Sequence, residues 1–342
     1  MQLFKIYWFA ISATLIIWTL TGFYLGWGAL FTVIVLTLLE TTFSADNAVI
    51  NSKVLVTMSS FWQKLFMTIG IFIAVFLVRF AMPIFIVMLT AGLGFNEVLN
   101  LALNNPHTYE HHLDKAEPLI SAFGGAFLLM IALSYFIDHE KNTHWLPLLE
   151  KRLGKLGKFD NITTFVMLLA SILLYFTVDH SHQAAVLIAS ICAMALHIGL
   201  ELLSAVFNNT RRSALSAVRK TGVAAFASFM YLELLDASFS LDGVIGAFAL
   251  TSSVVLIMAG LGAGAVWVRA MTIHLVRIKA LTKYQYLEHG AHWAIAFLGA
   301  IMLLKLYHIE LPEWIVGTLG IICIAAAVLT SVRAKMPQKA KV

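Results

Sequence analysis

Charge is scarce in this sequence. Of its 342 residues, 12% are charged and 60% are hydrophobic, whereas a soluble domain carries about 25% charged residues. The 23 Lys and Arg and 18 Asp and Glu side chains cannot cover the surface of a soluble protein of this length. This scarcity excludes a soluble enzyme, a nucleic-acid-binding protein and a disordered chain.

Cysteines and catalytic motifs are also scarce. The two cysteines, Cys192 and Cys323, both lie in apolar runs, which argues against a disulfide framework and a thiolate metal site. The sequence contains neither H-E-x-x-H nor G-x-S-x-G, the spacings that place a zinc site or a serine nucleophile. An enzyme is therefore not expected, and an intramembrane hydrolase is disfavoured.

Long apolar runs are abundant instead. A membrane helix needs about 20 apolar residues to cross the ~30 Å hydrocarbon core of a bilayer. Ten stretches of the sequence approach that length: residues 4–24, 28–51, 66–91, 119–137, 162–178, 183–207, 221–250, 253–275, 291–308 and 313–333. We therefore predict an all-α polytopic membrane protein with about ten transmembrane helices in the lipid bilayer.

The basic residues support this count. With ten spans, 19 of the 23 Lys and Arg residues fall on one side of the membrane, and Lys115 alone falls on the other. Because basic loops face the cytoplasm, both termini, the loop 138–161 and the tail 334–342 are predicted to be cytoplasmic. The same placement explains the pI of about 9.1 without a nucleic-acid partner. The loop 92–118, on the other side, carries acids and histidines and is expected to be solvated or to bind cations weakly.

An internal repeat divides the chain. The segment E-T-T-F-S-A-D-N-A-V-I (Glu40 to Ile50) shares its first acid, its F-S pair and its Asp with D-A-S-F-S-L-D-G-V-I-G (Asp236 to Gly246). We predict two halves, 1–178 and 183–333, with five spans each. Because five is odd, the second half would enter the membrane from the opposite side, an inverted repeat typical of secondary transporters.

Six acids lie inside the predicted spans, and each needs a partner. One ionised acid at the bilayer centre costs about 2.5–3.5 kcal/mol, so protons, arginines or a bound cation must neutralise it. Arg79 and Arg269 lie in spans and are predicted to balance part of this charge. A divalent cation would neutralise the remainder. The six acids are Glu40, Asp46, Glu201, Glu233, Asp236 and Asp242.

The oxygen donors of the two repeated motifs suit a hard cation. Carboxylate, amide and hydroxyl oxygens favour Mn²⁺, Mg²⁺ or Ca²⁺. The predicted metal ligands are Glu40, Asp46, Asn47, Asp236 and Asp242. An additional metal or proton site is assigned to Ser44, Ser240, Glu233 and Glu201. Two alternatives stay open at this point: Asp46 and Asp242 as helix caps, and Glu201 as the structural partner of His197.

The spacing within each motif predicts a broken helix. On a continuous helix, Glu40 and Asp46 would lie about 120° apart and ~9 Å apart along the axis, which is too far to share one ion easily. The sequences between the paired acids are poor helix formers. We therefore expect interruptions near 44–47 and 240–243, which would bring the acids together and free backbone carbonyls.

These motifs resemble the TerC family of bacterial integral membrane proteins, within the LysE-type transporter superfamily. The resemblance looks closest to a branch beside TerC that is filed as a domain of unknown function. It implies a bacterial inner-membrane protein with relatives linked to manganese export and tellurium resistance, and it implies Glu40, Asp46, Asp236 and Asp242 as ion ligands. The sequence hypothesis is therefore Mn²⁺ export in which protons compete for the same carboxylates. The alternatives are a TerC-like membrane scaffold without transport and a LysE-like porter of another solute.

Overall fold

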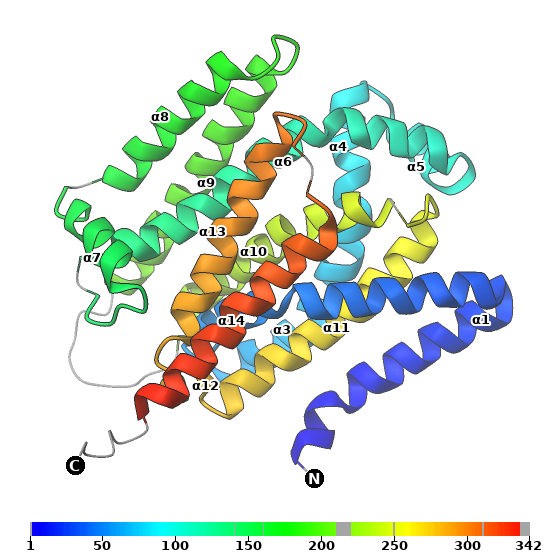
Figure 1. The fold of residues 1–342 in the computed structure, drawn as a ribbon. Helices are drawn as coiled ribbons and strands as arrows, with labels where there is room; N and C mark the ends of the chain where they lie inside the picture. Colours follow the sequence, from blue (N-terminus) through cyan, green and yellow to red (C-terminus); the bar gives the residue numbers. More distant parts are fainter. Residues whose placement is uncertain are drawn as a thin grey trace.

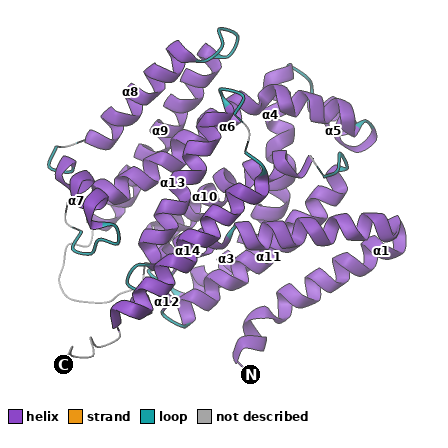
Figure 2. Cartoon of the chain, viewed as in Figure 1, coloured by secondary structure: helices purple, strands orange, loops and turns teal. Residues whose placement is uncertain are grey.

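The described part of the chain is mainly helical. The computed structural model describes the backbone of residues 2–139, 141–159, 161–209, 220–248, 250–309 and 311–335. Side chains are described over the same ranges except 2–4, 203–209, 241–242, 313–314 and 335. Within these ranges there is no strand, apart from a single bridge between Met58 and Lys220 (Figure 2). The prediction of an all-α protein is confirmed.

The first helix is bent into a hairpin. Helix α1 (Gln2–Phe43) turns at Gly26, where φ is 86° and ψ is 177°, a conformation open essentially only to glycine. The two legs of α1 meet at this bend and diverge away from it (Figure 1), and Trp18 Nε1 lies 3.5 Å from Thr37 Oγ1 of the second leg. After Ser44 the chain continues as the short helix α2 (Ala45–Leu55).

The remaining helices follow in chain order. They are α3 (Ser60–Phe72), the π-helix η1 (Ile73–Ala81), α4 (Met82–Ala91), α5 (Phe95–Asn104), α6 (Pro106–Ile137), α7 (Pro147–Leu156), α8 (Ile162–Thr177), α9 (Gln183–Asn209), α10 (Gly222–Phe248), α11 (Val254–Arg277), α12 (Ala280–Lys283), α13 (Leu287–Lys305) and α14 (Glu313–Lys335). Helices α3, η1 and α4 follow one another without a break. Helix α10 contributes side chains to both of the larger apolar cores, one shared with α2, α6, α9 and α13 and the other with α1, α4, α5, α6 and α11.

The helices have the dimensions of a multi-pass membrane protein. Within the described residues, eight helices are long and apolar enough to cross a bilayer, and α8 is a shorter apolar helix. Large apolar side chains such as Phe23 and Trp27 are mostly exposed, as lipid-facing residues would be. The start of α1 and the end of α14 lie at the same end of the molecule, together with α7 and α12 (Figure 1). We refer to this end as the terminal end and to the other as the distal end.

Two predicted loops contain helices. The segment 92–118 was expected to be a loop, but it forms α5 and the first turns of α6. Tyr109, Leu113 and Ala116 are buried at helical spacing, but the polar residues between them interrupt any long apolar run. The basic loop 138–161 contains α7, which begins at Pro147. The tail beyond 335 and most of the basic segment 208–220 lie outside the described residues.

One of the two predicted helix interruptions occurs. Ser44 separates α1 from α2, but the break is a single residue, because Ser44 N still donates to Glu40 O and Ala48 N to Ser44 O. The predicted interruption at 240–243 is wrong, since α10 runs unbroken from Gly222 to Phe248. Buried backbone groups without water have no other partners, so the helix continues through poor helix formers.

Candidate functional site

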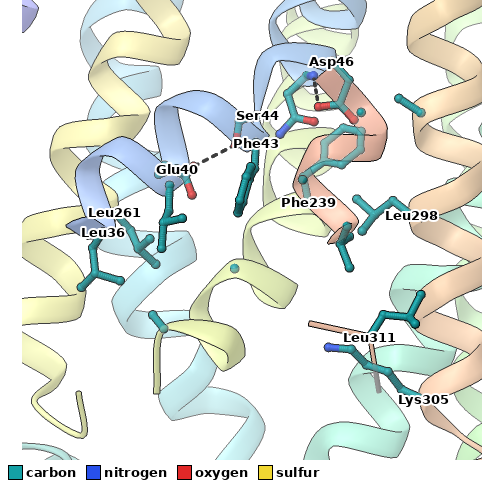
Figure 3. A pocket seen from close by; sticks show the side chains of 18 residues that line it. Leu36, Glu40, Phe43, Ser44, Asp46, Phe239, Leu261, Leu298, Lys305 and Leu311 are labelled. Carbon is teal, nitrogen blue, oxygen red and sulfur yellow. Dashed lines mark hydrogen bonds between the residues drawn. The ribbon is translucent and has the colours of Figure 1, made fainter. Parts of the chain in front are cut away.

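A cavity lies beside the junction of α1 and α2. Its volume is about 110 Å³, well above the ~10–15 Å³ that one water needs, so it has room for a small cation with water. Its polar lining comes from Glu40, Ser44, Asp46, Asn47 and Lys305 (Figure 3). The rest of the wall is mainly apolar and comes from α1, α10, α11, α13 and α14 and from Leu311.

The Ser44 break turns both acids of the first motif toward this cavity. Ser44 Oγ donates to Glu40 Oε1 at 3.3 Å, and Asn47 N donates to Asp46 Oδ1 at 2.9 Å, as the dashed lines in Figure 3 show. Glu40 closes the last turn of α1, and Asp46 lies in the first turn of α2. Both acids of the first motif therefore line one cavity, as expected, but the carbonyls of Glu40 and Ser44 keep their helical hydrogen bonds and are not freed.

Two side chains of the cavity, Asn47 and Asp46, have oxygens that the described residues satisfy only in part. Among the described side chains, Asn47 Oδ1 is buried and accepts no hydrogen bond. Asp46 is 5% exposed, and within the same part of the chain it forms no ion pair. An unpaired buried acceptor is costly, and hard oxygen donors are the ligands that Mg²⁺, Ca²⁺ and Mn²⁺ prefer. Together with Glu40 and Ser44, these groups could hold a cation.

Glu40 also belongs to an ion network of five buried side chains. Arg79 Nη2 donates to Glu40 Oε1 at 2.5 Å, and Arg79 Nη1 lies 4.0 Å from Asp236 Oδ2. Arg269 Nη2 lies 3.4 Å from the same Asp236 oxygen. Arg269 also holds Glu233 with two hydrogen bonds of 3.0 and 2.8 Å. The network therefore runs Glu40, Arg79, Asp236, Arg269, Glu233 and alternates in sign.

Local backbone features place the two arginines. Arg79 lies on the π-helix η1, a form of helix that is frequent at functional sites, and its Nη1 donates to Ala74 O at 2.8 Å. Arg269 lies over the Phe66 ring and donates to Phe66 O at 3.0 Å. A Cβ at Gly70 would overlap Arg269 and Glu233, so only glycine lets α3 approach them this closely.

The structure assembles only part of the predicted metal site. Asp236 and Glu233 lie in the ion network and do not line the cavity. The side chain of Asp242 lies outside the described residues. Ser240 Oγ is buried without a hydrogen-bond partner in the described part of the chain, away from the cavity lining. Glu201 lies elsewhere, 3.6 Å from His197. No group of three or more His, Cys, Asp and Glu side chains that could hold a metal occurs among the described residues.

The comparison with known families concerns most of the chain. The family model described as protein of unknown function DUF475 matches residues 45–338. The chain belongs to the DUF475 family. The matched part of this DUF475 protein starts immediately before Asp46, and it includes Asn47 and the whole second motif. No curated protein and no solved structure matches the chain.

Sequence reasoning missed a buried acid of the DUF475 protein in the basic loop. Glu150 on α7 is fully buried, 2.8 Å from His289 Nδ1 and 3.3 Å from Lys141 Nζ, and it accepts hydrogen bonds from Trp145 N and Leu146 N. Burial raises the pKa of Glu150, but hydrogen bonding and charge from His289 and the charge of Lys141 outweigh it and lower the pKa to about 2. The helix signals of 147–157, Pro at the start and Gly at the end, could have revealed α7.

Proposed function

We propose that this protein carries a divalent cation, Mn²⁺ in the first place, across a bacterial inner membrane. The observation that carries the proposal is the cavity at the α1–α2 junction, where Glu40, Ser44, Asp46 and Asn47 present oxygen donors to one space. Secondary transporters commonly bind their ions near the bilayer midplane where a helix is interrupted, and the single-residue break at Ser44 is an interruption of this kind on a smaller scale. The ligands are assigned to the first motif, with Asp46 and Asn47 as the central pair.

The charge count supports a divalent ion. Counted as ionised, the ion network and Asp46 together hold four carboxylates and two guanidinium groups, which leaves two negative charges. Lys305 at the distal end of the cavity does not cancel these charges, because it lies 3.8 Å from Glu117. One divalent cation or two protons would neutralise the remainder, so protons would compete for the site and could drive exchange.

The helix arrangement is compatible with the expected topology. If the two legs of α1 and the shorter helix α8 each cross the bilayer, the chain crosses ten times and returns its end to the side of its start. The basic residues then place the terminal end in the cytoplasm. The two five-span halves would stand in inverted orientation, with Glu40 and Asp236 on corresponding helices and Arg79 between them.

The proposal is tested by transport in proteoliposomes that contain a Mn²⁺-sensitive dye. Wild-type protein should conduct Mn²⁺, and Asp46→Asn should reduce the rate at least about tenfold, because it removes the one acid of the cavity without an arginine partner. The control is Glu97→Gln, which removes an exposed carboxylate on α5. Equal rates for wild type and Asp46→Asn would refute the proposal. They would favour a scaffold, whose function should depend on the exposed basic residues of α7 instead.

A further inference from the structure

Helix α2 separates the cavity from the terminal end. Asp46 and Asn47 in its first turn line the cavity, and Lys53 lies in its last turn. Every residue from Asp46 to Ser52 is buried. The helix packs against α10, α11, α13 and α14, so it fills the space through which an ion would leave toward the terminal end.

Helix α2 buries polar side chains along its length, among apolar ones that join the core. Asn51 follows Asn47 by one turn, and its Oδ1 is likewise buried without a hydrogen-bond partner in the described part of the chain. Residues four apart lie on one face of a helix, ~6 Å apart along its axis. A permanent seal would be expected to use apolar side chains, because each unpaired amide oxygen is costly. The amide oxygens of Asn47 and Asn51 are instead spaced so that a cation could bind first one and then the other.

The terminal end of α2 is attached by a partly exposed ion pair. Lys53 Nζ pairs with Glu288 Oε1 in the first turn of α13, and these side chains are 46% and 26% exposed. The Lys53 ammonium also lies 5.1 Å from the centre of the Tyr135 ring, and Tyr135 stacks on His292 at 3.6 Å. Solvent screens a pair this exposed, so it is weak enough to break and re-form.

The start of α13 is held much more firmly on its other side. His289, the residue after Glu288, lies 2.8 Å from the fully buried Glu150, and Trp293 Nε1 donates to Glu150 at 3.3 Å. Buried contacts to an ionised carboxylate are stronger than an exposed pair. Helix α13 is therefore fixed to α7, and the Lys53–Glu288 pair is the weaker of the two polar contacts made by the start of α13.

We propose that α2 is the gate of the cavity toward the terminal end, with the Lys53–Glu288 pair as its latch and Asn51 as a second cation-binding residue uncovered when the latch opens. This inference rests on the proposed transport function. In the structure the latch is closed and Asn51 is buried, so the cavity is shut toward the terminal end. Opening requires α2 to leave α13 while α13 stays on α7.

Thiol labelling tests the gate without measuring transport. In a chain with Cys192→Ser and Cys323→Ser, Asn51→Cys serves as the reporter, and a membrane-impermeant maleimide is added to sealed vesicles of each orientation. Labelling from the terminal side should be slow with the latch intact and about tenfold faster with Glu288→Gln. Lys155→Gln, which removes an exposed charge on the same side of the molecule, should leave the rate unchanged.

A charge reversal separates a latch from general damage to the fold. Lys53→Glu combined with Glu288→Lys restores the pair and should return labelling to the slow rate. Equal labelling with and without Glu288→Gln, or no recovery in the reversed pair, would overturn the gate. Fast labelling that Mn²⁺ does not slow would support the gate and would count against Mn²⁺ as the ligand, so the two proposals can fail separately.

Discussion

The Arg79 guanidinium donates to the Glu40 carboxylate across 2.5 Å, and both side chains are almost completely buried. Glu40 therefore belongs to two groups at once, since its carboxylate joins the ion network and also faces the cavity. A cation that binds at Asp46 and Asn47 would compete with Arg79 for Glu40. The ion pair thus couples occupancy of the cavity to the network that reaches Asp236 and Glu233.

This pairing predicts a non-additive effect on stability. Arg79→Met should lower the free energy of unfolding by about 3–5 kcal/mol, because it leaves the buried Glu40 without its partner. The double variant Arg79→Met, Glu40→Met should recover most of that loss, since two apolar side chains replace the pair. Thermal unfolding of the purified protein in detergent measures both. Additive losses in the double variant would show that the two side chains are not coupled.

A glycine on α11 is predicted to position Glu40. A Cβ at Gly264 would overlap Cβ and Cγ of Glu40, so Gly264→Ala must displace that carboxylate from Arg79 and from the cavity. We expect a lower melting temperature and a Mn²⁺ transport rate reduced by at least about tenfold. Gly199→Ala on α9 is the matched control, because a Cβ there meets no atom within 4 Å. Its stability should be unchanged or higher, since Ala favours a helix by about 1 kcal/mol.

The identity of a ligand can be tested by changing its chemical softness. Asp46→Cys would place a thiolate where the structure has a hard carboxylate, and thiolates prefer Cd²⁺ and Zn²⁺ over Mn²⁺. If Asp46 contacts the ion, Asp46→Cys should lose Mn²⁺ transport and gain Cd²⁺ binding. Asp46→Ser should also lose Mn²⁺ transport, but it should gain no Cd²⁺ binding. The comparison is made with Cys192 and Cys323 replaced. Identical Cd²⁺ binding by both variants would exclude contact between Asp46 and the ion.

Composition and periodicity predict where the long apolar helices of the described chain lie, because a bilayer would impose length and hydropathy on each of them, although eight such helices and the shorter α8 are found where ten spans are predicted. They do less well where polar residues lie inside a helix. The buried Tyr109 and Leu113 of α6 were assigned to a loop, since the acids and histidines around them interrupt the apolar run. Local helix propensity also gives the wrong prediction at 240–243, where it predicts a break in α10. The buried backbone groups there have no hydrogen-bond partners except those within the helix, so the helix continues.

In the candidate site, too, some features can be predicted from the sequence and others depend on packing. Carboxylates inside spans were recognisable from the sequence, because a buried charge needs a partner, and the structure places Arg79 and Arg269 against three of them. Which carboxylates share one space depends on packing between distant segments. For that reason the sequence could not separate Asp46, which lines the cavity, from Asp236, which lies in the network. It gave no sign of Glu150, whose burial arises only when α7 meets α13.

The buried Glu150 makes stability depend on pH in the acid range. Its pKa is about 2 in the folded chain against 4.5 for the free side chain, so the ionised form is favoured by folding. Because one pKa unit corresponds to about 1.36 kcal/mol, this shift stabilises the folded chain by about 3 kcal/mol. It should be fully present above pH ~4.5 and should be lost as the pH falls through about 2.

Glu150→Gln isolates this contribution, because glutamine resembles the protonated acid. The melting temperature of the variant should lie several degrees below wild type at pH 7, and the difference should narrow steadily between pH ~4.5 and 2 as the wild-type carboxylate takes up its proton. Other acids titrate in both proteins, so they cancel in the difference. A gap that stays constant over this range would mean that the carboxylate shape, and not its charge, holds α7 against His289 of α13.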